Sequence, residues 1–149
     1  MKITKETAKK LYEESPIWFK DELEREFGKE TFNKKHFTDF KTYEDACEEQ
    51  DINPQAVYFV NDTPDVIAYK KLKIIVKAIN QGWKPNWKND NEQKWYPWFV
   101  LSSGFGFSDS NYDCTCTDTD VGSRLCFESK EKSDYAAQQF IEIYKEFLT

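Results

Sequence analysis

Histidine is almost missing from this 149-residue chain: His36 is the single one, so histidine-centred chemistry would depend on it alone. It stands in a stretch without clear periodicity, which favours a surface position. Nucleophile-elbow and Walker-type motifs are absent. Gly104-Phe105-Gly106 begins like a dinucleotide-binding loop, but Asp109 occupies the place of the third glycine. We therefore expect a protein that is not an enzyme and needs no cofactor.

Long apolar runs are missing too. No run approaches the roughly 20 residues of a membrane-spanning helix. The first six residues, MKITKE, contain no apolar stretch of the signal-peptide type. We expect a protein that has no membrane contact and is not secreted through a signal peptide. The formal net charge of −6 argues against a protein that coats nucleic acid over its whole surface.

The few cysteines do not form a recognisable metal-binding pattern. Two of them, Cys114 and Cys116, lie two apart on an expected strand, so their side chains share a face. A zinc site needs four ligands, commonly with paired cysteines in a C-x2-4-C spacing, and the single histidine is far away in the sequence. Free thiols in a reducing cytosol are favoured, with a cysteine-based metal site as the alternative. The cysteines are Cys47, Cys114, Cys116 and Cys126.

Aspartates cluster in the same region. Asp113, Asp118 and Asp120 could together bind a hard cation, because carboxylate oxygens are the ligands that such ions prefer. The EF-hand spacing fails, since with Gly122 as the sixth loop residue the first would be Thr117 instead of an acid. A solvated hairpin loop is the favoured interpretation, and we assign no metal site.

Capping signals and apolar periodicity predict five helices. Serine or threonine precedes each expected start except that at 17, where Ser15-Pro16 gives the cap-then-proline signal. Thr42 and Asp45 have the spacing of a capping box. Gly28 and Gly82 follow two of the expected ends. The predicted helices cover residues 5–14, 17–27, 43–50, 64–81 and 130–148.

The helix at 64–81 has the clearest amphipathic pattern. Its apolar residues recur three and four apart, so they share one face, and three lysines share the opposite, exposed face. The predicted buried face consists of Ala68, Leu72, Ile75, Val76 and Ile79. The last helix has a similar stripe, formed by Ala136, Phe140, Tyr144 and Phe147.

Between these two helices the pattern favours strands. Alternating or aromatic segments cover residues 95–101, 102–108, 111–117 and 124–128. The sequence therefore predicts an α+β fold with N-terminal helices, a three- or four-stranded antiparallel sheet and a C-terminal packing helix. We expect one domain over residues 1–149, in which residues 1–41 could be a peripheral helical extension of a main body at 42–149.

Charge is segregated along the chain. Residues 43–66 hold seven acidic and no basic side chains, net −7, whereas residues 67–99 hold seven basic and two acidic ones, net +5. Segregated charge can create a local potential that the net charge conceals. It can equally reflect internal complementarity, with the acidic block folded beside the basic one, which is the interpretation we favour.

Four of the five tryptophans lie in the basic block, interleaved with lysines. Bases stack on aromatic faces and lysines contact phosphates, so the combination suits single-stranded nucleic acid. Tryptophan is also enriched in protein interfaces. The structural alternative is that the rings belong to the core, and we expect at least half of them to be structural. Trp83 and Trp87 lie in a polar turn and are the pair expected to be exposed. The candidate partner-binding residues are Trp83, Lys84, Trp87, Lys88, Lys94, Trp95, Trp98, Lys70, Lys73 and Lys77.

Several segments of the chain carry a resemblance to a known group. They are GWKPNW at 82–87, YPWF at 96–99, SSGFGFS at 102–108 and VGSRLCF at 121–127. With the closing helix, they resemble a group of small uncharacterised proteins from bacteriophages and prophages of gut bacteria, over roughly residues 40–149. The resemblance implies a phage or mobile-element gene product that acts inside a bacterial cell or within a virion. It implies no catalytic residue, because no activity is known for the group.

Three functional hypotheses follow. The leading one is a non-enzymatic, phage-type interaction protein that binds another protein through its Trp-rich surface. The alternative is a single-stranded nucleic-acid-binding protein that uses residues 83–98 and the lysine face of the helix at 64–81. A virion structural component is the third, and it depends on the resemblance alone. The expected location is accordingly the bacterial cytoplasm or the virion.

Overall fold

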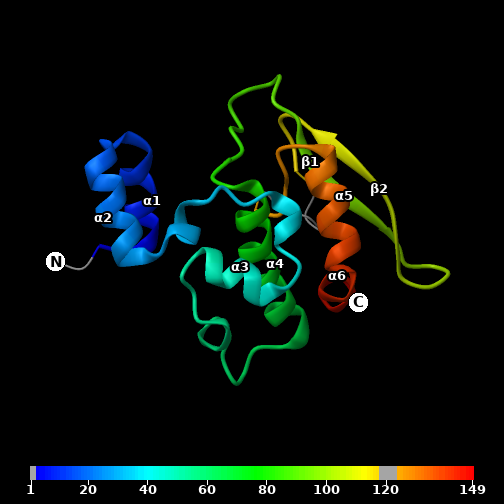
Figure 1. The fold of residues 1–149 in the computed structure, drawn as a ribbon. Coiled ribbons are helices and arrows are strands. Elements are labelled where there is room, and N and C mark those ends of the chain that lie inside the picture. Colours follow the sequence, from blue (N-terminus) through cyan, green and yellow to red (C-terminus); the bar gives the residue numbers. More distant parts are fainter. Residues whose placement is uncertain (1–2, 118–123) are drawn as a thin grey trace. The chain divides into compact units, whose positions relative to one another are not determined.

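The computed structural model describes residues 3–117 and 124–149. The chain divides into two compact units, one that ends at His36 and one that begins at Phe37 (Figure 1). This boundary lies close to residue 41, where the sequence predicts the end of a helical extension. Helices and an antiparallel sheet together give an α+β fold, which confirms the predicted fold class.

The first unit is built from two helices, α1 (Lys5–Glu14) and α2 (Ile17–Phe27), and the short 3-10 helix η1 (Lys29–Phe32). Both α-helices have the predicted bounds. Thr4 caps α1, since its hydroxyl accepts a hydrogen bond from the Thr7 N–H at 3.3 Å. Gly28, with φ +83°, ends α2 in a conformation that side chains rarely adopt.

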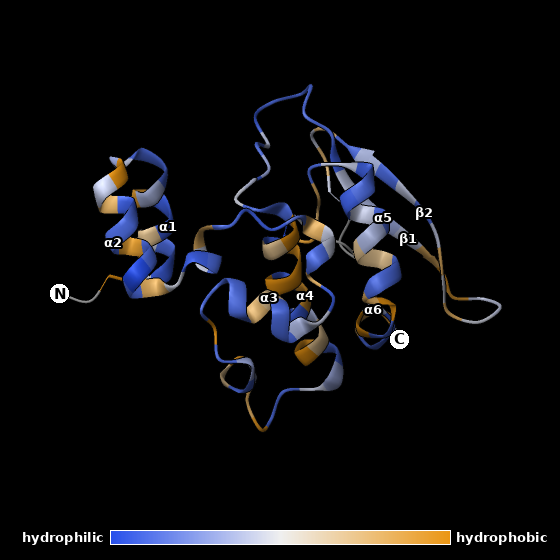
Figure 2. Cartoon of the chain, viewed as in Figure 1, coloured by the Kyte–Doolittle hydropathy of each residue, from blue (hydrophilic) through white to orange (hydrophobic). Residues whose placement is uncertain are grey.

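The second unit is organised around α4 (Pro64–Asn80), whose predicted face is buried at every position. Figure 2 shows apolar residues concentrated on this helix. The short helix α3 (Tyr43–Glu49) packs against it and begins with the predicted capping box, in which Thr42 and Asp45 each accept the other's N–H. Two 3-10 turns, η2 (Phe37–Asp39) and η3 (Pro54–Ala56), complete this part of the unit.

The closing segment forms two helices, so the prediction of one helix over 130–148 is wrong. α5 (Lys130–Gln139) and α6 (Ile141–Leu148) meet at Phe140, whose backbone leaves the helical region with φ −112° and ψ 28°. The break redirects the chain, because α5 packs against the sheet and α6 against α4. Phe140 is itself buried, so tertiary packing fixes the bend.

The sheet has fewer strands than the sequence predicts. In the described residues it consists of β1 (Lys94–Val100) and β2 (Gly106–Asp113), paired antiparallel with a bulge between Trp98 and Phe99. The expected strand at 102–108 is largely the turn between them, and the one at 111–117 ends at Asp113. Residues 124–128 contribute an isolated bridge between Phe127 and Trp95 instead of a strand.

Asn80 holds the segment around Phe127 on the side that faces away from β1, since the backbone of Phe127 itself pairs with Trp95. Its buried side-chain amide donates to the carbonyl oxygen of Cys126 at 2.9 Å and accepts from the N–H of Glu128 at 3.2 Å. The Cys126 carbonyl and the Glu128 N–H, on either side of Phe127, thus have a partner in a side chain of α4, where a neighbouring strand would otherwise supply one.

The core is completed by Phe127 and Leu125, which belong to the same buried cluster as the inner face of α4.

Candidate functional site

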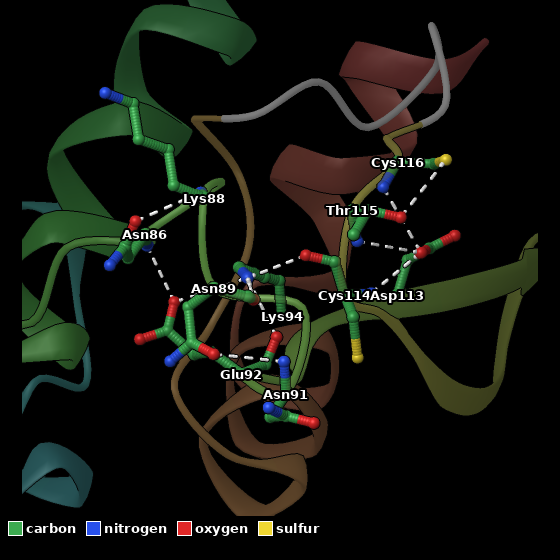
Figure 3. A network of polar contacts seen from close by, with 10 residues as sticks. All are labelled: Asn86, Lys88, Asn89, Asn91, Glu92, Lys94, Asp113, Cys114, Thr115 and Cys116. Carbon is green, nitrogen blue, oxygen red and sulfur yellow. Dashed lines mark hydrogen bonds and ion pairs between the residues drawn. The ribbon is translucent and has the colours of Figure 1, made fainter.

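Lys94, predicted to contact a partner, is buried, with 1% of its surface exposed. Its ammonium group donates three hydrogen bonds to backbone carbonyl oxygens, those of Cys114 at 2.7 Å, Glu92 at 2.8 Å and Asn89 at 3.1 Å (Figure 3). An ammonium has three N–H donors, so this set uses all of them. The prediction for Lys94 is therefore wrong: its charge is committed inside the unit.

The loop before β1 is ordered around this ammonium. The carboxylate of Glu92 lies 3.5 Å from Lys94 and also accepts the Asn86 N–H at 2.6 Å. The Lys94 nitrogen lies 5.3 Å from the centre of the Trp87 ring, in the geometry of a cation–π contact. Trp87 is half-buried, so ring and ammonium stabilise the loop and do not form an open stacking platform.

The tryptophans of the basic block differ in exposure from the expected pattern. Trp83 and Trp87, expected to be exposed, are half-buried, and so is Trp95. Trp98 is the exposed one, at 52%. Trp95 and Trp98 are three apart on β1, and side chains at odd spacing point to opposite faces of a strand. Trp95 is further held by a backbone pair with Phe127, at 2.9 and 2.7 Å.

The lysine face of α4 is only partly available. Lys73 and Lys77 are exposed, as predicted, and so are Lys84 and Lys88 in the following loop. Lys70 is half-buried and forms an ion pair of 2.6 Å with Asp62, which corrects its assignment to the free lysine face.

The environment of Lys70 bears on the charge pattern as well. Its ammonium hydrogen bond and the Phe59 N–H both lower the pKa of the Asp62 carboxyl. Asp62 belongs to the acidic block and Lys70 to the basic one, so this pair fits the internal complementarity that we favour.

Three exposed apolar side chains of β1 and the residue after it form what we call the hairpin patch, made of Trp98, Val100 and Leu101. Their exposed fractions are 52, 41 and 55%. Trp98 and Val100 share the face of β1 opposite Phe99, whose ring packs against Tyr144 of α6. Sequence reasoning named Trp98 but missed the other two. The two-residue alternation within β1 is the signal that could have found Val100.

A second exposed apolar pair, also missed, lies in the turn that precedes α4. Phe59 and Val60 are 73 and 102% exposed. The turn is closed by the Asp62 N–H, which donates to the Phe59 carbonyl oxygen at 3.1 Å. The Lys70 ammonium lies 4.7 Å from the centre of the Phe59 ring, so this ring has an intramolecular contact that accounts for part of its position.

The aspartate and cysteine cluster has a structural role where it is described. One carboxylate oxygen of Asp113 accepts the N–H groups of Cys114, Thr115 and Cys116, at 2.7, 3.3 and 3.3 Å (Figure 3). These bonds lower the pKa of Asp113 and turn the chain after β2. Asp118 and Asp120 lie outside the described residues. Within 3–117 and 124–149, no group of three or more histidine, cysteine, aspartate or glutamate side chains could hold a metal ion.

Comparisons with protein-family models, with curated proteins and with solved structures find no match for this chain. Among the helices of the described part, none has the length and apolarity needed to span a bilayer.

Proposed function

We propose that this protein binds another protein through the hairpin patch. The observation that carries the proposal is the exposure of Trp98 beside two aliphatic side chains, on a strand whose other face is packed. Tryptophan anchors are enriched among residues that dominate binding energy, and clustered exposed apolar side chains mark interaction sites. The proposed contact surface is therefore smaller than the Trp-rich surface expected from the sequence: it contains one tryptophan, Trp98, and the two aliphatic residues Val100 and Leu101.

Single-stranded nucleic acid is a weaker candidate. Base stacking needs open aromatic faces beside free cations. Two of the candidate cations, Lys70 and Lys94, are engaged within the protein, and three of the four rings are half-buried. The remaining support for this alternative comes from exposed lysines, two on α4 and two in the following loop: Lys73, Lys77, Lys84 and Lys88.

Origin and location are proposed on the sequence resemblance alone. We propose a phage or mobile-element gene product that acts in the bacterial cytoplasm without catalysing a reaction. A structural role in the virion is the alternative, and mass spectrometry of purified particles would detect the protein there.

Site-specific photo-crosslinking tests the binding surface. A photoreactive phenylalanine analogue is placed at Trp98 and, as a matched control, at Tyr112, an exposed aromatic residue on the other face of the same hairpin. The proposal expects a discrete protein adduct from position 98 and none from position 112. An excess of unlabelled protein should compete for the adduct, and the V100S/L101S variant should not.

Two results would count against this function. Equal adducts from both positions would show that the patch is not the contact surface. Anisotropy of a labelled oligothymidylate at low salt supplies the second test, because phosphate contacts weaken steeply as salt rises. Salt-dependent binding that is lost in the K84A/K88A variant would favour the nucleic-acid alternative instead.

A further inference from the structure

Side-chain oxygens accept backbone N–H groups at every second position along β2. Each acceptor is the Oδ1 atom of an aspartate or asparagine, and each donor is the N–H of the next residue. The three bonds have nearly equal lengths of 2.8, 2.8 and 2.7 Å. The pairs are Asp109 with Ser110, Asn111 with Tyr112, and Asp113 with Cys114.

The direction of these N–H groups follows from the ladder. The N–H and carbonyl of Trp95 are paired with Phe127, on the side of β1 away from β2. Tyr112, the partner of Trp95 in the register, therefore belongs to a pair without backbone hydrogen bonds, and its own polar groups point away from β1. Ser110 lies two residues before Tyr112 on the same strand, so its N–H and carbonyl also point away from β1. Its partner in the register is Pro97, which has no N–H.

The capped N–H groups of Ser110 and Tyr112 thus lie along the outer edge of the sheet, whereas the Cys114 N–H belongs to the turn after β2. This edge is accessible, because Asp109, Asn111 and Tyr112 are exposed. An exposed edge strand normally offers a row of unpaired donors and acceptors to any extended chain. Here the outward N–H groups of Ser110 and Tyr112 already have acceptors from their own strand.

We propose that Asp109 and Asn111 close the outer edge of β2 against strand addition by another chain. An added strand would have to displace two local hydrogen bonds before it could form its own ladder. A lysine strengthens the closure at one end, since the Lys130 ammonium lies 2.7 Å from the same Asp109 oxygen that accepts the Ser110 N–H. The closure itself does not depend on the proposed function.

The test removes the caps and measures both amide exchange and self-association. The variants are N111A and D109A/N111A. N111D serves as the rescue, because it keeps a side-chain oxygen at the same position, and S108A serves as a control on the same strand. Far-UV circular dichroism and slow exchange of α4 amides establish that each variant is folded.

Loss of the hydrogen bond from the Tyr112 N–H should raise the exchange rate of the Tyr112 amide by about fivefold, the factor that corresponds to a net bond of about 1 kcal/mol. N111D and S108A should exchange like the wild type. In sedimentation equilibrium, D109A/N111A should associate at concentrations where the wild type, N111D and S108A do not. Unchanged Tyr112 exchange in folded N111A, or a folded double variant that associates no more than the wild type, would overturn the proposal.

Discussion

The ammonium group of Lys94 lies 2.7 Å from the carbonyl oxygen of Cys114. Lys94 begins β1 and Cys114 follows the end of β2, so this hydrogen bond joins the two open ends of the hairpin. The same ammonium holds the carbonyl oxygens of Asn89 and Glu92 in the preceding loop. A buried cation therefore fixes the approach to the sheet and the exit from it.

Replacement of Lys94 by methionine should lower the free energy of unfolding by about 3 kcal/mol, because three carbonyl oxygens around this buried side chain lose a charged donor. Urea unfolding followed by circular dichroism measures the change. Lys88→Met is the matched control, since Lys88 is exposed in the same segment and its variant should stay close to wild type. Equal stability of the two variants would contradict the structural role of Lys94.

Removal of the Asn80 amide should also lower the free energy of unfolding, because this amide forms hydrogen bonds with two backbone groups around Phe127. The Asn80→Ala variant leaves a carbonyl oxygen and an N–H without their partner and should cost about 2 kcal/mol of unfolding free energy. Asn80→Asp keeps an acceptor for the Glu128 N–H but offers no donor to Cys126, and a buried carboxylate carries its own desolvation cost. Both variants should therefore unfold at lower urea concentration than Gln81→Ala, the exposed neighbour.

Acid should weaken the turn after β2 through Asp113. Three backbone N–H groups lower the folded-state pKa of this carboxyl below the unfolded value of about 3.9. A lowered folded pKa stabilises the fold above the unfolded pKa, and this contribution is lost as pH falls through the folded pKa. The amide resonances of Cys114, Thr115 and Cys116 should shift together below about pH 4.

The Asp113→Asn variant separates this effect from general acid unfolding. It keeps a side-chain oxygen to accept the N–H groups but does not titrate. Its amide resonances in the turn should therefore remain constant over the same pH range. A variant that shows the wild-type shift would place the titrating group elsewhere.

The sequence was sufficient to predict those helices whose ends and buried faces are specified by residues close together in the chain. Thr42 and Asp45 form the capping box that their spacing predicts, and the apolar residues of α4 are buried because their three- and four-residue intervals place them on one face. These features depend on neighbours within one or two turns, which the sequence displays directly.

The errors concern residues whose state depends on distant partners. A lysine among tryptophans in a polar segment is typically exposed, whereas Lys94 is buried with its ammonium bonded to three carbonyl oxygens, one of them from Cys114, twenty residues away. The strand expected at 124–128 is reduced to a bridge, and its backbone groups on the side away from β1 pair with Asn80, more than forty residues earlier in the chain. At Phe140 no glycine or proline marks the break between α5 and α6.

The hairpin patch could be predicted from the sequence only in part. Alternation within β1 could have indicated that Trp98 and Val100 share a face, but not that this face is the open one. That depends on α5, which packs against the other side of the hairpin, and on the contact of Phe99 with Tyr144 of α6. The exposure of Trp98 and Val100 therefore depends on how the whole unit packs, whereas their position on one face follows from the strand alone.

Thiol reactivity should follow burial. Burial raises the pKa of the Cys126 thiol to about 11, and it also raises the pKa of Cys47. A thiolate is the reactive form, so at pH 8 iodoacetamide should modify the exposed Cys116 well before either buried thiol. Peptide mass spectrometry over a time course measures the order. In denaturant all four cysteines should react at similar rates, and rapid modification of Cys126 in the folded protein would show that the segment packed beside Asn80 opens readily.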